Sequence, residues 1–341
     1  MIISVKALLV SCVAIFAVST HSVAQERPRP GRTHVVVVTG IGGEPYYTES
    51  FHRIAVSLIE ASRKGGVPAS AVSYLRGDGV RSAQGSAGFT TRATRDAVES
   101  VLVKLAQSTG PEDAVLIVLV GHGSGEGPDS RFNLPGPDMS ARDFARILSR
   151  FEGAAVALVN AASSSGDFVP VLTGGDKRRV IITATKSGFE RNETIFGRHF
   201  AAAFAGAGAD VDKDGRVSLL EAFSYARREV EREYGTQGRI LTEHAIMGGD
   251  STLARTMALN WTDATVARAG GDADASTNQR IAALEREQQQ IQDRVEALKA
   301  RKDRMNATDY DRELETLLVE LSLKTRALKE ARKSGPGSPT P

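Results

Sequence analysis

Two apolar runs of the chain end in residues that suit acyl-transfer chemistry. Residues 114–120 lead directly into Gly121-His122-Gly123, and residues 154–159 lead into a turn that contains Ser163. A histidine can act as the general base for a serine or cysteine nucleophile, while nearby backbone N–H groups hold the oxyanion that forms. The one cysteine of the sequence is Cys12, close to its N-terminus. The candidate partner of His122 is therefore a hydroxyl rather than a thiol.

These residues follow the predicted strands of an α/β domain. Four short runs are almost continuously apolar, as expected for strands buried on both faces of a parallel sheet: residues 35–38, 114–120, 154–159 and 180–184. Helical periodicity separates them, at residues 50–64, 94–107 and 140–151, with Ser140 as the expected N-cap of the last. This alternation predicts a three-layer α/β/α sandwich with a mostly parallel sheet. Ligands of such sheets bind beyond the carboxyl ends of the strands, where His122 and the Ser163 turn would share one edge.

The sequence resembles that of bacterial secreted caspase/legumain-like proteins, which have the fold of clan CD cysteine peptidases. The resemblance spans residues 33–250 and is carried by Gly121-His122-Gly123 and four further segments: residues 132–140, 182–185, 193–200 and 242–245. It implies a caspase-like sandwich in which His122 matches the catalytic histidine and Gly123 the oxyanion glycine. Two registers remain open for the nucleophile. Counting from the strand end places Ala162 at that position, whereas counting back from Ser165-Gly166 places Ser163 there.

The missing thiol separates two functional interpretations. A serine hydroxyl is not ionised near neutral pH, so Ser163 would need His122 as an aligned base, itself oriented by a third group. Asp167, Glu126 and Asp129 are the candidates for that third group, and the sequence places none of them. Short hydroxyls in turns more often satisfy local backbone groups. We therefore expect a peptidase homologue without catalytic activity that acts in binding or assembly. The alternative is an active hydrolase that uses Ser163 with His122.

Residues 210–221 match every specified position of the EF-hand calcium loop. Oxygen ligands are expected from the side chains of Asp210, Asp212, Asp214, Ser218 and Glu221 and from the carbonyl of Arg216. Gly215 permits the sharp turn of such a loop, and helical patterns at residues 200–207 and 219–233 flank it. Four carboxylates at this spacing would repel one another without a cation. The loop predicts a Ca²⁺ ion that stabilises the fold.

The N-terminus has the pattern of a secretory signal peptide, residues 1–24. Lys6 precedes an apolar stretch, and Ser22-Val23-Ala24 forms a cleavage site of small residues, which predicts a periplasmic or secreted protein. Lipid attachment at Cys12 is the less favoured alternative, because few apolar residues separate it from Lys6. Later runs fall short of the ~20 apolar residues of a transmembrane span. Lys and Arg number 43 against 41 Asp and Glu, a balance that does not favour nucleic acid as a partner.

The rest of the chain divides into linkers and a helical C-terminal part. Residues 25–32 and 251–277 are the expected linkers, and residues 334–341 the expected disordered tail. Between them, residues 278–333 carry apolar side chains at alternating steps of three and four, which predicts an antiparallel helical hairpin or coiled coil. Its apolar stripe is narrow, so we expect it to pack against the core domain, a second copy of the chain, or an unknown protein or peptide partner. A third interpretation is an envelope scaffold that acts through these helices.

Overall fold

The computed structural model describes most of the chain between residues 31 and 333. The described residues are 31–79, 88–174, 178–206, 208–212, 214–259 and 305–333, with six positions between 284 and 298. The predicted signal peptide with Cys12, the linker up to residue 30, residues 260–277, most of the first half of the predicted hairpin (residues 278–304) and the tail 334–341 lie outside the described residues.

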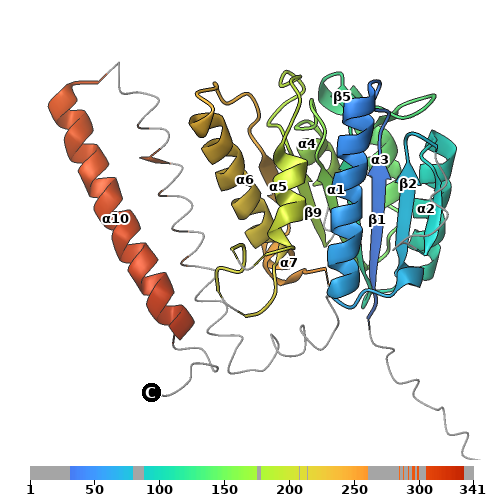
Figure 1. Cartoon of the computed structure of the whole chain (residues 1–341). Coiled ribbons are helices and arrows are strands. Elements are labelled where there is room, and N and C mark those ends of the chain that lie inside the picture. The colour runs from blue at the N-terminus through green and yellow to red at the C-terminus, as the bar shows by residue number, and fades with distance from the viewer. Residues whose placement is uncertain are drawn as a thin grey trace, which may run out of the picture.

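A seven-stranded sheet forms the centre of the molecule (Figure 1). Its order is β10-β9-β8-β4-β1-β2-β3, and β10 is antiparallel to β9 while all other pairs are parallel. The strands are β1 (Thr33–Thr39), β2 (Val72–Arg76), β3 (Phe89–Arg92), β4 (Ala114–Val120), β8 (Ala155–Asn160), β9 (Arg179–Thr183) and β10 (Ile246–Gly249). The four predicted apolar runs are confirmed as β1, β4, β8 and β9, which are consecutive neighbours in the middle of the sheet.

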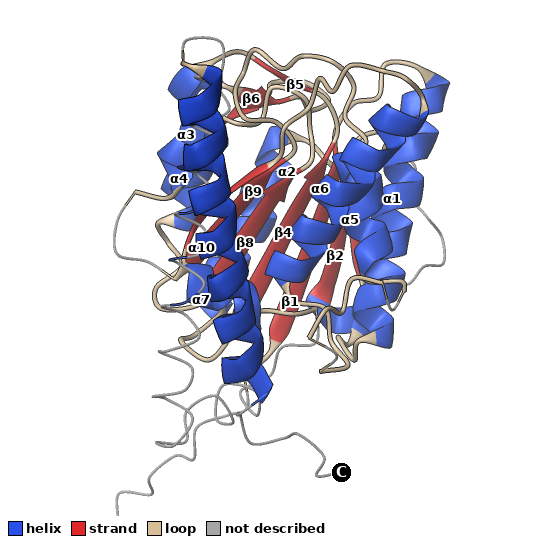
Figure 2. Cartoon of the chain, turned by 90° about the vertical axis from the view of Figure 1, so that its left-hand side faces the viewer, coloured by secondary structure: helices blue, strands red, loops and turns tan. Residues whose placement is uncertain are grey.

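Helices cover both faces of this sheet, which confirms the predicted three-layer α/β sandwich (Figure 2). One face packs against α1 (Pro45–Lys64), α5 (Phe196–Ala203), α6 (Leu219–Thr236) and α7 (Ser251–Thr256). The other face packs against α2 (Arg95–Ser108), α3 (Ala141–Leu148) and α4 (Phe168–Leu172). Successive residues of β1 alternate between the two cores: Val35 and Val37 enter the first, and Val36 and Val38 enter the second.

Local sequence signals fix where these helices begin. The side chain of Thr94 accepts a hydrogen bond from the first turn of α2, and Ser140 forms a capping box with Asp143 at the start of α3. Helix α1 begins at Pro45, five residues before the expected start at residue 50, because proline at the first helical position is already set to the helical φ angle.

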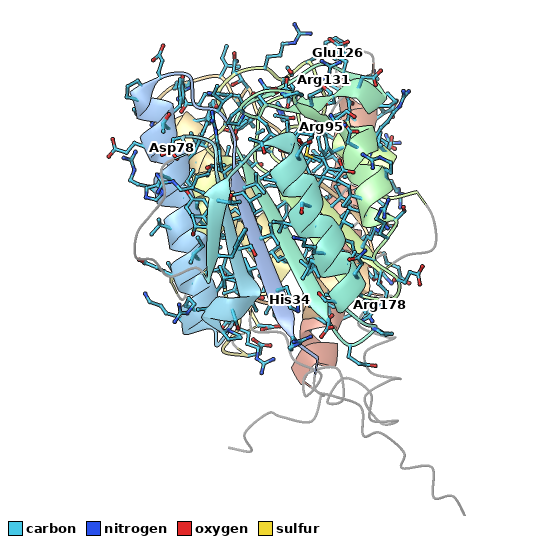
Figure 3. All side chains as sticks on the ribbon, turned by 90° about the vertical axis from the view of Figure 1, so that its right-hand side faces the viewer. His34, Asp78, Arg95, Glu126, Arg131 and Arg178 are labelled. Carbon is cyan, nitrogen blue, oxygen red and sulfur yellow. The ribbon has the colours of Figure 1, made fainter. Side chains whose placement is uncertain are left out.

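A small second sheet lies over the carboxyl edge of the main one. It consists of β5 (Gly123–Ser124), β6 (Arg131–Phe132) and β7 (Met139–Ser140), paired in antiparallel fashion. Short 3₁₀ turns, η1 (Ala69–Ala71) and η2 (Gly127–Asp129), complete the connections. Figure 3 shows Glu126 and Arg131 at this end of the molecule and His34 and Arg178 at the opposite end.

The domain extends beyond the expected boundary at Asp250. Residues 251–256 were expected to be linker, but they form α7, whose first turn is capped by the Asp250 carboxylate. Leu253 and Met257 are buried in the first core, and the Met257 carbonyl accepts a hydrogen bond from the N–H of Leu219. The apolar residues 257–259 therefore close the domain instead of leaving it.

The C-terminal part contains a long helix, α10 (Ala307–Lys333). One side of α10 packs against the described positions between 284 and 298, with Ile291, Val295, Leu298, Tyr310 and Leu317 in one buried cluster. Ion pairs follow an antiparallel order, because Arg294 contacts Glu320 (3.1 Å) and Glu287 contacts Lys324 (2.6 Å). Among the described residues, the structure has no helix with the length and apolar character needed to cross a membrane.

Candidate functional site

His122 lies directly beyond the end of β4. Its imidazole packs edge-on against two aromatic rings of α1, with centroid distances of 4.7 Å to Tyr47 and 5.1 Å to Phe51. The His122 carbonyl accepts a hydrogen bond from the N–H of Asn133 (3.0 Å), which ties the segment to the small sheet. The ring of His122 is thus directed at the start of α1.

Ser163 lies beside Gly123, because the strands that precede them are neighbours. β4 and β8 pair in parallel up to Leu119 and Asn160, so the segments that follow leave the sheet together. The N–H of Gly123 donates to Oγ of Ser163 (3.3 Å), and the Ser163 hydroxyl is 3.4 Å from the Gly123 carbonyl. Ser163 is only 4% exposed. The prediction that the two motifs share one edge of the sheet is confirmed.

The histidine and the serine are neighbours in the fold without being paired. Within the part of the chain that the structure describes, no hydrogen bond joins the His122 ring to Ser163. The acids considered as a third group are engaged elsewhere. Asp167 accepts hydrogen bonds from two backbone N–H groups (2.7 and 3.1 Å), Glu126 pairs with Arg191 (2.5 Å), and Asp129 pairs with an arginine of α3 (3.5 Å).

The turn after β8 is held by backbone hydrogen bonds. Ser164 has a φ of +51°, its N–H donates to the carbonyl of Glu190 (2.8 Å), and its carbonyl accepts from the Ser130 hydroxyl (2.7 Å). Ala162 is fully buried, and its N–H donates to the Asn160 side chain (3.2 Å). Either register of the nucleophile position therefore falls on a buried residue.

Thr185 anchors the second half of this turn. Its hydroxyl oxygen accepts hydrogen bonds from the N–H groups of Ser165 (2.8 Å) and Gly166 (3.0 Å) and donates to the carbonyl of Ser187 (3.2 Å). Thr185 is completely buried. Hydroxyls in this turn thus satisfy backbone groups, which is the turn chemistry that short hydroxyl side chains often supply.

A buried carboxylate fixes α5 close to this edge. Glu243, which is 2% exposed, accepts hydrogen bonds from the backbone N–H groups of Ile195 (2.9 Å) and Phe196 (3.1 Å). Burial raises the pKa of the Glu243 carboxyl, and the two N–H donors oppose this shift. The carboxylate holds the first turn of α5 in place.

Sequence reasoning did not select Tyr47, Thr185 or Glu243. Tyr47 contacts His122, and the negative charge of Glu193 together with burial raises the pKa of its hydroxyl. A signal for Tyr47 existed, because it opens the helix after β1 and so lies at the same carboxyl edge as His122. Thr185 and Glu243 lie in segments 182–185 and 242–245, which the family resemblance had identified without assigning their roles.

The predicted calcium loop brings three of its carboxylates together. One oxygen each of Asp210, Asp212 and Asp214 lies within 4.8 Å of the other two. Gly215 has a φ of +84°, and its N–H donates to Asp210 Oδ2 (3.0 Å). Asp210 Oδ1 is buried and has no hydrogen-bond partner among the described residues. A cluster of oxygen donors with one such unpaired oxygen fits the preferences of Ca²⁺.

The remaining predicted ligands serve the helix that follows. Glu221 accepts hydrogen bonds from Val211 N–H (2.9 Å) and, through its other oxygen, from the N–H and hydroxyl of Ser218 (both 2.9 Å). Ser218 and Glu221 form the capping box of α6. Burial, followed by the charges of Glu221 and Asp214, raises the pKa of Asp212. The loop therefore combines a helix start with a concentration of negative charge.

Comparisons with known proteins gave matches among solved structures alone. The chain matches no protein-family model. It matches no curated protein in sequence. A protein of Geobacter sulfurreducens, GSU0716, aligns with 66% of this chain and 97% of its own at 12% identity and a TM-score of 0.42. The Drosophila initiator caspase Dronc aligns with 64% of this chain and 79% of its own at 10% identity, also with a TM-score of 0.42.

Proposed function

We propose that this chain is a caspase/legumain-like peptidase homologue that has lost peptidase chemistry and acts in binding or assembly. One observation carries the proposal: the Ser163 hydroxyl is hydrogen-bonded to the backbone of Gly123, and the His122 ring packs on aromatic side chains of α1. The nucleophile candidate and the base candidate therefore have different partners.

The Gly123 contact engages two groups that catalysis would need, the Gly123 N–H and the Ser163 hydroxyl. The resemblance implies that the Gly123 N–H would hold the oxyanion, but this N–H already donates to Ser163 Oγ (3.3 Å). A substrate carbonyl would have to displace the hydroxyl that is supposed to attack it. Serine also needs a base to become a nucleophile. An active hydrolase would thus require His122 to leave Tyr47 and Phe51, and Ser163 to leave Gly123.

An activity-based fluorophosphonate probe tests the proposal against the alternative hydrolase. We expect no labelling of the purified mature chain at concentrations that label an ordinary serine hydrolase completely. Labelling that disappears in both Ser163→Ala and His122→Ala would overturn the proposal. Urea unfolding of the two variants provides the control that each remains folded.

We further propose that the loop of residues 210–221 binds Ca²⁺ and that the ion stabilises the domain. The clustered oxygens of Asp210, Asp212 and Asp214 support this, as does the unpaired Asp210 Oδ1. Ser218, Glu221 and the Arg216 carbonyl would complete the ligand set. The carboxylates repel one another, and a bound ion would offset this repulsion and so stabilise the fold.

Thermal unfolding with calcium and with chelator tests the calcium site. At about 100 times the dissociation constant, binding stabilises by about 2.7 kcal/mol, a shift of about 5–11 °C for a domain of this size. Asp212→Ala should abolish the shift, whereas the exposed Glu49→Ala on α1 should retain it. Identical melting curves with calcium and with chelator would contradict the proposal.

The proposed compartment is the periplasm or the exterior of a bacterial cell. The signal pattern of residues 1–24 supports export, and the cysteine-free sequence after Cys12 is compatible with an oxidising compartment. N-terminal sequencing of the exported chain should start at Gln25. A chain that retains residues 1–24 and stays in the cytoplasm would contradict this assignment.

A further inference from the structure

A second apolar face of α10 is exposed. The inner side of the helix carries Tyr310, Leu317 and Leu328, which are buried. Leu318, Val319 and Leu323 lie on the other side and are 48%, 53% and 63% exposed. Asp311, Glu315 and Ser322 line a shallow groove together with the first two of these residues. Helix α10 thus uses one face to contact the described positions between 284 and 298 and leaves another exposed.

The exposed face has a symmetrical spacing. In chain order its central part consists of Glu315, Leu318, Val319, Ser322, Leu323 and Arg326, separated by steps of three, one, three, one and three residues. At 3.6 residues per turn, these positions share one side of the helix over about three turns. The same series of steps is obtained when the sequence is traversed in the opposite direction.

The two halves of α10 carry opposite net charges. Residues 307–319 contain four acids and one arginine, a net charge of −3, whereas residues 320–333 contain two acids and five Lys or Arg, a net charge of +3. Glu315 lies on the acidic half of the exposed face, and Arg326, which is 79% exposed, lies on the basic half.

We propose that this face binds the same face of a second copy in antiparallel orientation. A two-fold axis between Glu320 and Leu321 places Leu318 opposite Leu323, Val319 opposite Ser322, and Glu315 opposite Arg326. Apolar side chains then meet at the centre, and each acidic half meets a basic half. A parallel pair would place Glu315 beside Glu315 and Arg326 beside Arg326. Interhelical charge of this kind sets orientation.

This dimer is independent of the chemistry at His122, because α10 contributes no residue to that site. It identifies a second copy of the chain as the partner of the helical hairpin. The pairing of two such C-terminal parts would cover the exposed apolar face of each α10.

Sedimentation equilibrium of the purified mature chain measures the predicted association. We expect the wild type to form a dimer. In the double variant Leu318→Glu/Leu323→Glu, the dissociation constant of this dimer should rise about tenfold or more, a loss of about 1.4 kcal/mol for each factor of ten. Ile240→Glu, at an apolar residue that is 86% exposed outside α10, is the matched control and should leave the dimer unchanged. A wild-type chain that stays monomeric at all concentrations would overturn the proposal.

Disulfide cross-linking measures the orientation, since the mature chain has no cysteine of its own. Glu315→Cys mixed with a size-tagged Arg326→Cys should give the mixed disulfide. Glu315→Cys alone should not cross-link, because the antiparallel pair separates the two copies of residue 315 by about 16 Å along the helix axis. Efficient cross-linking of Glu315→Cys to itself would show a parallel pair and refute the antiparallel arrangement.

Discussion

Replacing Gly123 with alanine should disrupt the contact between the two motif segments. A Cβ atom at this position would lie 2.2 Å from the Ser163 carbonyl oxygen and 3.0 Å from the Arg131 carbonyl oxygen, whereas ordinary contacts start at 3.4 Å. Both neighbours are backbone atoms, so neither side chain rotation nor a small shift relieves the overlap. Overpacking of this kind costs about 1–3 kcal/mol. Separation of the two segments would also break the Gly123–Ser163 hydrogen bond, worth about 0.5–1.5 kcal/mol.

Urea unfolding followed by fluorescence measures this cost. We expect Gly123→Ala to lower the free energy of unfolding by about 1.5–4.5 kcal/mol, the sum of the two contributions. Gly235→Ala in α6 is the matched control, because its Cβ would meet no atom within 4 Å; it should be neutral or slightly stabilising. An unfolding midpoint for Gly123→Ala equal to that of the wild type would refute the close approach of Gly123 and Ser163.

Three further predictions concern the same edge of the sheet. Thr185→Val should destabilise by at least about 2 kcal/mol in urea, because two buried N–H groups lose their acceptor; a loss below about 0.5 kcal/mol would contradict this anchor. The pKa of Glu243 is raised in the folded protein, so protonation of this carboxyl favours folding. The stability linked to that proton is fully present below the unfolded pKa of about 4.5 and is lost as pH rises through the folded pKa. Glu243→Gln should remove that part of the stability–pH curve, and an unchanged slope would count against the assignment. Thiols introduced by Ala162→Cys and Ser163→Cys should react with a thiol reagent only after unfolding, since both positions are buried; rapid reaction in the native state would disprove their burial.

The centre of the sheet was predictable because its strands are buried on both faces. β1, β4, β8 and β9 are continuous apolar runs for that reason, and the sequence identifies them without knowledge of their order. β3 and β10 lie at the edges of the sheet: β3 (Phe-Thr-Thr-Arg) is largely exposed, and β10 (Ile-Met-Gly-Gly) contains two glycines. Such strands carry no strong periodic signal, because their neighbours rather than their own residues determine the pairing.

The candidate site was predictable in its location but not in its contacts. The ends of β4 and β8 indicated where His122 and Ser163 would lie, yet only the adjacency of the two strands brings Ser163 to Gly123. The packing of His122 on Tyr47 depends on how α1 starts after a glycine-rich turn, which hydrophobic periodicity does not specify. The predicted calcium loop was the reverse case, since its candidate ligands are local in sequence and their spacing alone predicts the cluster of Asp210, Asp212 and Asp214.

Mass-spectrometric profiling of a diverse peptide mixture tests the loss of peptidase chemistry most directly, since it presumes neither the nucleophile nor the substrate. Wild-type protein and His122→Ala should be compared with calcium present, after the same incubation. The proposed loss of catalysis predicts identical peptide profiles for both proteins and for a protein-free sample. New cleavage products that appear with the wild type and are lost in His122→Ala would contradict it.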